Sequence, residues 1–159
     1  MECLKDLQER DGTSLGLTKP RVVEQFLIEK DADRWKPKWE AQMQQLNLFG
    51  PERKPLRKLP FKFSYQFRCH DERCNGHKMM IADWEVYELF WNVLDRSRDA
   101  DETIAKVRTK FFDEMCGPKK DTHFFVGTVN RYRSWIVLGV FWPPKPVPRE
   151  IQTELPLAL

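Results

Sequence analysis

A strict alternation of side chains over residues 61–69 constrains the fold of this chain more than any other feature. The apolar side chains share one face of an extended chain, and they are Phe61, Phe63, Tyr65, Phe67 and Cys69. The polar side chains between them share the other face, and they are Lys62, Ser64, Gln66 and Arg68. A period of two over this length is the pattern of a β-strand with one buried face. We therefore predict a strand over residues 61–69, paired in a hairpin with a second strand over 77–82.

The turn of this predicted hairpin carries Cys69, Cys74 and His77 in the spacing C-x4-C-x2-H. Zinc prefers four thiolate or imidazole ligands in a tetrahedron, and the two residues between Cys74 and His77 let both reach one ion. The pattern predicts a structural Zn²⁺ site, with Cys116 or His123 folding back as the fourth ligand. Two alternatives stay open. Either no metal binds and Cys69 is a core residue, or a catalytic metal keeps its fourth position open.

Length and charge narrow the class of protein. A chain of 159 residues suits one domain that buries its own core. The net charge of +3 permits nucleic-acid binding without requiring it. The charged start of the chain lacks an apolar signal region, and no stretch approaches the roughly 18 apolar residues of a membrane span. We expect a cytoplasmic protein, in which clustered Cys and His favour metal over disulfides.

Proline, glycine and charge divide the chain into four predicted parts. Residues 1–50 are expected to form an N-terminal helical segment, and the proline-rich basic run over 51–60 an exposed linker. Residues 61–142 would form an α+β core that contains the Cys/His hairpin. Residues 143–159 hold many prolines and read as a flexible tail.

The expected elements within these parts follow from apolar periodicity. Helices are predicted from residues 21, 37, 83 and 101, and further strands over 122–129 and 135–142, the last as a central strand. The order ββααββ after the N-terminal helical segment indicates an α+β fold. We expect one antiparallel sheet of about four strands with helices on one face.

An acidic pair, Asp83 and Glu85, directly follows the second predicted strand. Carboxylates at a strand end can bind Mg²⁺ in a nuclease, so a metal-dependent nuclease is the runner-up function. Asp83 equally suits a helix N-cap, and Glu85 suits the first turn of that helix. We therefore expect binding rather than catalysis.

Basic side chains on the polar face of the first strand and near the last hairpin suggest contacts with phosphate. The residues expected to make them are Lys62, Arg68, Lys78, Arg131 and Arg133. The alternative is an ordinary solvated surface.

A short motif, Gln45-Leu46-Asn47-Leu48-Phe49, resembles the pentapeptide by which bacterial replication and repair proteins dock on the sliding clamp. Such a peptide binds by placing Leu48 and Phe49 in an apolar groove. An accessory subunit that docks on the sliding clamp is therefore a further predicted function. The alternative is that Leu46 and Phe49 are core contacts at a helix end.

Several stretches together resemble a group of bacterial proteins found among mobile-element and defence genes. The stretches are SLGLTKP at 14–20, LPFKF at 59–63, FRC at 67–69, CNGH at 74–77, DWE at 83–85, FFVGT at 124–128 and LGVFWPP at 138–144. The resemblance implies a bacterial cytoplasmic protein, a role for the Cys/His hairpin and DWE, and a leading domain that this chain lacks. It implies no reaction. The predicted function is a zinc-stabilised nucleic-acid- or protein-binding module of a bacterial DNA-metabolism or defence system.

Overall fold

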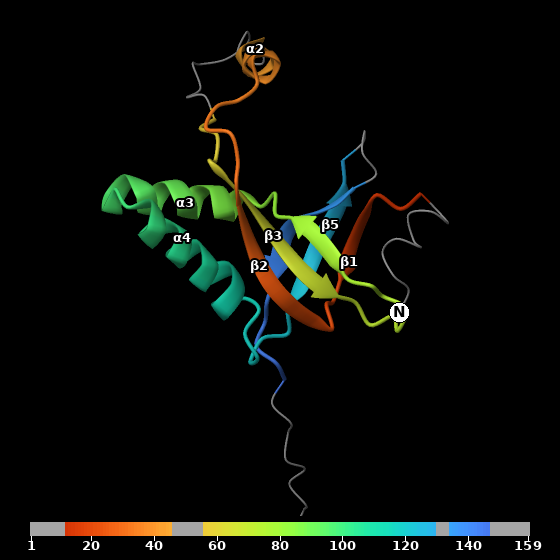
Figure 1. Ribbon diagram of the computed structural model, residues 1–159. Helices are drawn as coiled ribbons and strands as arrows, with labels where there is room; N and C mark the ends of the chain where they lie inside the picture. The colour runs from red at the N-terminus through yellow and green to blue at the C-terminus, as the bar shows by residue number, and fades with distance from the viewer. Residues whose placement is uncertain (1–11, 46–55, 130–133, 147–159) are drawn as a thin grey trace, which may run out of the picture.

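The computed structural model describes residues 12–45, 56–129 and 134–146. In these residues six strands form two antiparallel three-stranded sheets, with α3 and α4 side by side next to them (Figure 1). One sheet has the order β1-β5-β6, built from Leu15–Thr18, His123–Thr128 and Trp135–Phe141. The other has the order β2-β3-β4, built from Val22–Lys30, Phe61–Arg68 and His77–Met80. The helices are α2 (Pro37–Gln45), α3 (Trp84–Ser97), α4 (Ala100–Arg108) and the π-helix η1 (Thr109–Glu114).

The α+β class is confirmed, but the prediction of one sheet of about four strands is wrong. The two strands that the sequence did not predict, β1 and β2, lie within residues 1–50, which were expected to form a helical segment. Strand β1 pairs with β5, and β2 pairs along its whole length with β3. The predicted helix from residue 21 is therefore strand β2. A register shift between Val23 and Gln25 interrupts its alternation. Apolar residues then recur at a spacing that imitates a helix.

Strand β3 lies at the centre of the core, as the alternation predicted. Phe63, Tyr65 and Phe67 are each at most 2% exposed. Tyr65 stacks on Phe124 of β5 with 4.6 Å between ring centroids, which packs one sheet on the other. Phe63 meets Phe90 of α3 at 6.2 Å, which packs the helical layer on the same strand.

Helix α3 begins where the sequence predicted, with Asp83 as its N-cap. Helix α4 begins at the N-cap Asp99, whose side chain accepts hydrogen bonds from two backbone N–H groups. The predicted helix from residue 101 continues past α4 as η1, where the backbone widens into a π-helix. This widened turn carries Phe111, which is buried beneath β3.

Strand β6 is not the predicted central strand, since β5 lies between it and β1. Ile81, which follows β4, forms a parallel bridge with Val137 of β6, and the N–H of Ala82 donates to the Val137 carbonyl at 2.7 Å. Strand β6 therefore joins the two sheets through its edge.

Part of the predicted basic linker is tied to α3. The N–H of Arg57 donates to the Tyr87 hydroxyl at 2.9 Å, and the Arg57 guanidinium pairs with Asp95. The same guanidinium lies 3.5 Å from the ring centroid of Trp91. Residues 51–55 of the linker and 147–159 of the predicted tail lie outside the described residues. No helix in the described part of the chain is both long and apolar enough to cross a membrane.

Candidate metal centre

The register of the β3–β4 hairpin brings the three predicted ligands together. Phe67 pairs directly with His77 across the hairpin, and their rings lie 5.1 Å apart. Cys69 follows Phe67 by two residues, so it continues the buried face of β3 just beyond the end of the strand. Both Cys69 and His77 are buried, whereas Cys74 is half-buried. The strand pairing thus fixes two ligands against the aromatic core.

The turn between the strands positions Cys74. The N–H of Cys74 donates to the Asp71 carbonyl at 3.0 Å, and the Asp71 carboxylate accepts from the N–H of Arg73 at 2.9 Å. Gly76 then adopts a φ of 94°, a left-handed conformation that side chains disfavour. The sequence reasoning missed Asp71, although an aspartate that starts a turn of this kind is a recognised signal.

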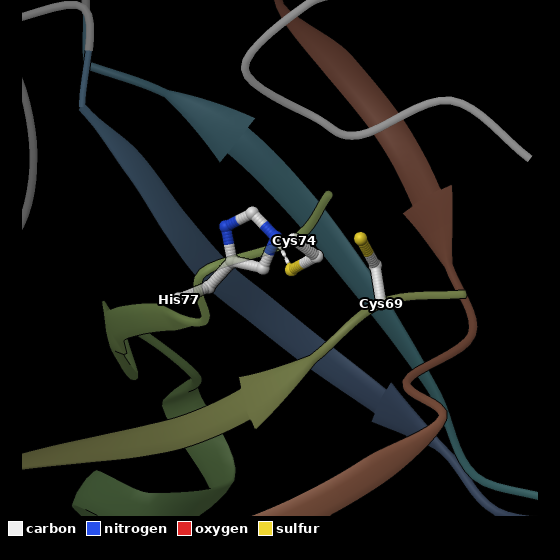
Figure 2. A group of neighbouring side chains, drawn as sticks. All are labelled: Cys69, Cys74 and His77. Carbon is white, nitrogen blue, oxygen red and sulfur yellow. Dashed lines mark hydrogen bonds between the residues drawn. The ribbon is translucent and has the colours of Figure 1, made fainter. Parts of the chain in front are cut away.

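The three ligand atoms lie within 4.8 Å of one another, close enough to hold one metal ion. Figure 2 shows the side chains of Cys74 and His77 facing each other, with Cys69 beside them. Cys74 Sγ lies 3.3 Å from His77 Nε2. Tetrahedral zinc, with Zn–S of about 2.3 Å and Zn–N of about 2.0 Å, separates a sulfur and a nitrogen ligand by about 3.5 Å. The separation of Cys74 Sγ and His77 Nε2 is close to that value.

A backbone hydrogen bond also positions the sulfur of Cys74. The N–H of Gly76 donates to Cys74 Sγ at 3.4 Å. No disulfide joins Cys69, Cys74 and Cys116. The arrangement can therefore offer two sulfurs and one imidazole nitrogen to a single cation.

Neither candidate for the fourth ligand lies with the other three. Cys116 Sγ instead donates to the Phe111 carbonyl at 3.4 Å, and burial raises the pKa of this thiol to about 12. Its sulfur is therefore directed to the backbone of η1 and away from the hairpin turn. His123 Nδ1 lies 2.9 Å from the Asp121 carbonyl oxygen. The remaining cysteine of the chain, Cys3, falls outside the described residues.

The acidic pair, Asp83 and Glu85, forms the start of helix α3, which is the structural alternative to a catalytic role. The Asp83 carboxylate accepts from the N–H of Glu85 at 2.8 Å and caps α3. Glu85 lies exposed in the first turn of that helix. Neither residue belongs to a group of three possible metal ligands in the described chain.

The predicted phosphate-contacting residues of the β2-β3-β4 sheet each meet a carboxylate on β2 or directly after it. The pairs are Lys62 with Asp31 at 3.3 Å, Arg68 with Glu24 at 2.8 Å and Lys78 with Glu29 at 2.8 Å. Arg131 and Arg133 lie outside the described residues. The basic face is therefore an interleaved row of both charges.

The clamp-like pentapeptide falls largely outside the structure. Gln45 is the last residue of α2, whereas Leu46, Leu48 and Phe49 are not described. Docking on a sliding clamp therefore stays a prediction.

Comparison with protein families places the whole site within one domain. The family described as "Domain of unknown function (DUF8757)" matches the chain over residues 1–157. The chain belongs to this family. The metal-ligand hairpin and the capping residue Asp83 thus both lie within the DUF8757 domain. No curated protein and no solved structure matches the chain.

Proposed function

We propose that this protein is a nucleic-acid-binding module whose β3–β4 hairpin is held by structural zinc. The observation that carries the zinc site is the convergence of Cys69, Cys74 and His77, with their ligand atoms within 4.8 Å. Thiolates favour zinc over magnesium or calcium, which prefer oxygen ligands. A single imidazole beside two sulfurs also fits zinc, since iron–sulfur clusters are held mostly by cysteine.

A structural role suits the hairpin because its turn has little apolar contact of its own. His70, Glu72, Arg73 and Asn75 are all exposed, so the turn buries few side chains besides the ligands. A metal supplies folding free energy to such a segment directly. Cys69 and His77 extend the core of the protein, and zinc would link Cys74 to that core.

The nucleic-acid part of the proposal is supported by the basic side chains of the β2-β3-β4 sheet. The side chains of Lys62, Arg68 and Lys78 are each about half exposed, at 50%, 48% and 52%. Exposed ion pairs contribute only about 0–1 kcal/mol, so phosphate groups can replace the carboxylates at small cost. The overall charge of +3 is compatible with such a partner.

Protein binding is the second candidate, favoured by an apolar surface on the other sheet. Leu17 of β1 and Phe125 of β5 are direct cross-strand partners, yet they are 56% and 48% exposed. Leu15 is 69% exposed beside them. Exposed apolar side chains that cluster in this way mark interaction sites. A Leu17→Glu plus Phe125→Glu variant should lose a protein partner in a pull-down while it keeps its metal.

The first test is metal content, measured by plasma mass spectrometry on protein purified without chelator. We expect one equivalent of zinc, and we expect Cys74→Ser to lose both the zinc and part of the stability. Cys116→Ala is the matched control and should keep its zinc, because Cys116 lies outside the ligand group. Wild-type protein that is folded and zinc-free would overturn the structural site. Loss of zinc from a Cys3→Ser variant would assign the fourth position to that thiol.

A further inference from the structure

A cavity lies at the opposite end of β3 from the metal centre. It measures about 510 Å³ and is lined by the segment before α2, the first residues of α2, residues 56–59, the first residues of β3, Met80 and Ile81 at the end of β4, and Tyr87 of α3. Figure 1 shows α2 standing apart from the two sheets, above this end of β2 and β3. Sites for small ligands have volumes of about 300–1,000 Å³, so the cavity can admit a nucleobase with its sugar and phosphate.

Aromatic side chains form part of the cavity wall and are held in place at their edges. Trp35 and Trp39 lie 6.0 Å apart, and Trp35 Nε1 donates to the Leu56 carbonyl at 2.9 Å. Tyr87 accepts from a backbone N–H through its hydroxyl and stacks on Trp84 at 4.7 Å. Trp39 is 53% exposed, which leaves ring surface open to a ligand. Indole surface of this kind is a platform for base stacking.

The charges around the cavity favour an anion. Five cationic side chains line it, namely Arg34, Lys36, Arg57, Lys58 and Lys62, with Asp31 as the one carboxylate. Asp31 pairs with Lys58 and Lys62, and Arg57 pairs with Asp95 outside the cavity. Arg34 and Lys36 have no carboxylate partner in the described part of the chain. These two side chains are therefore the ones available to an incoming phosphate.

We propose that this cavity binds a nucleotide unit of single-stranded nucleic acid, with the base against Trp35 or Trp39 and the phosphate against Arg34 and Lys36. The proposal rests on the proposed nucleic-acid-binding function and names the site and class of nucleic acid. A base paired and stacked in a duplex cannot enter a concave site, so single strands are the fitting ligand. One of the four segments that line the cavity is rich in the residue types that such a site needs, since residues 34–39, RWKPKW, contain three cations and two tryptophans.

The test is fluorescence anisotropy of a labelled oligo(dT) titrated with the zinc-loaded protein across a range of salt concentrations. Trp39→Ala should weaken binding roughly 5- to 150-fold, the range for loss of one stacked base. Arg34→Ala should reduce the slope of log affinity against log salt by about 0.7, the value for one phosphate contact on a single strand. Lys38→Ala is the matched control, because Lys38 is an exposed neighbour that does not line the cavity. The affinity and the salt slope of Lys38→Ala should stay close to those of the wild type.

The outcomes separate this inference from the function on which it rests. Wild-type protein that binds neither oligo(dT) nor a duplex would overturn the nucleic-acid-binding function itself. Binding that Trp39→Ala and Arg34→Ala leave unchanged would overturn the cavity as the site and leave that function standing. A free mononucleotide that competes as well as an unlabelled oligonucleotide at equal concentration would show that the ligand is a nucleotide and not a single strand. Equal affinity for duplex and single strand would overturn the preference for single strands.

Discussion

The Tyr65 hydroxyl donates a hydrogen bond of 2.6 Å to the carbonyl oxygen of Phe111, which ties the middle of β3 to the π-helical turn. The Cys116 thiol donates to the same carbonyl. Burial raises the pKa of Tyr65 well above its ordinary value and that of Cys116 to about 12. Both groups therefore keep their protons at neutral pH and act as donors.

Removal of the Tyr65 hydroxyl should destabilise the fold. In Tyr65→Phe the buried Phe111 carbonyl loses its shortest side-chain donor, and we expect a loss of about 1–3 kcal/mol in the free energy of unfolding. Urea unfolding followed by tryptophan fluorescence measures the change. Tyr87→Phe is the control, because the Tyr87 hydroxyl bonds at a solvent-exposed position and its loss should cost less. Equal losses in the two variants would contradict the structural role of the buried bond.

Asp83→Ala should act through helix capping. The carboxylate satisfies the N–H of Glu85 at the start of α3, so its removal should cost about 0.5–2 kcal/mol of stability. Asp83→Asn preserves an acceptor oxygen and should recover most of the loss. The nuclease alternative makes a different prediction, namely Mg²⁺- or Mn²⁺-dependent cleavage that Asp83→Asn abolishes. Cleavage with that pattern would show that capping is not the main role of Asp83.

Gly76→Ala should weaken metal binding. The φ of 94° at Gly76 is costly for alanine by roughly 1–2 kcal/mol, and the strained turn would displace Cys74 from His77. Zinc affinity, measured by competition with a chromophoric chelator, should fall roughly 5- to 30-fold if that cost appears wholly in binding. Asn75→Ala changes an exposed neighbour in the same turn and should leave the affinity nearly unchanged. An unaltered affinity in Gly76→Ala would show that the turn does not set the ligand geometry.

The ion pair of Asp31 should make stability depend on pH in the acid range. The hydrogen bond from Lys58 lowers the pKa of Asp31 from 3.8 to about 2. A carboxyl whose pKa is lower in the folded state stabilises the fold above the unfolded pKa. That contribution is lost as the pH falls from about 4 to about 2. Lys58→Ala should therefore cost on the order of 1 kcal/mol at pH 6, since solvent screens the pair, and less at pH 3.

Urea unfolding of wild type and Lys58→Ala at the two pH values measures this difference. Lys78→Ala is the control, because Lys78 and Glu29 are both about half exposed and their pair should contribute little at either pH. A Lys58→Ala deficit that stays the same from pH 6 to pH 3 would contradict the assignment to Asp31.

The sequence predicted those parts of the fold whose signals are local. The alternation of residues 61–69 identified β3, and the spacing of Cys74 and His77 identified two possible metal ligands, whose sulfur and nitrogen atoms lie 3.3 Å apart. Strand β2 was missed because the register shift after Val23 breaks the period of two. The position of Cys116 beside Phe111 depends on how η1 packs under β3, and no spacing in the sequence encodes that packing. The cavity was missed because its walls come from four separate segments.

Strand β4 spans only four residues, yet His77 begins it and Met80, which lines the cavity, ends it. A shift of one residue against β3 would turn His77 away from the cysteines and would also turn Met80 to the opposite face. A metal ion bound by His77 would therefore fix the register of β4 against β3, and with it the position of Met80 in the cavity wall. Zinc occupancy and ligand binding at the far end of β3 would then rise and fall together without any contact between them.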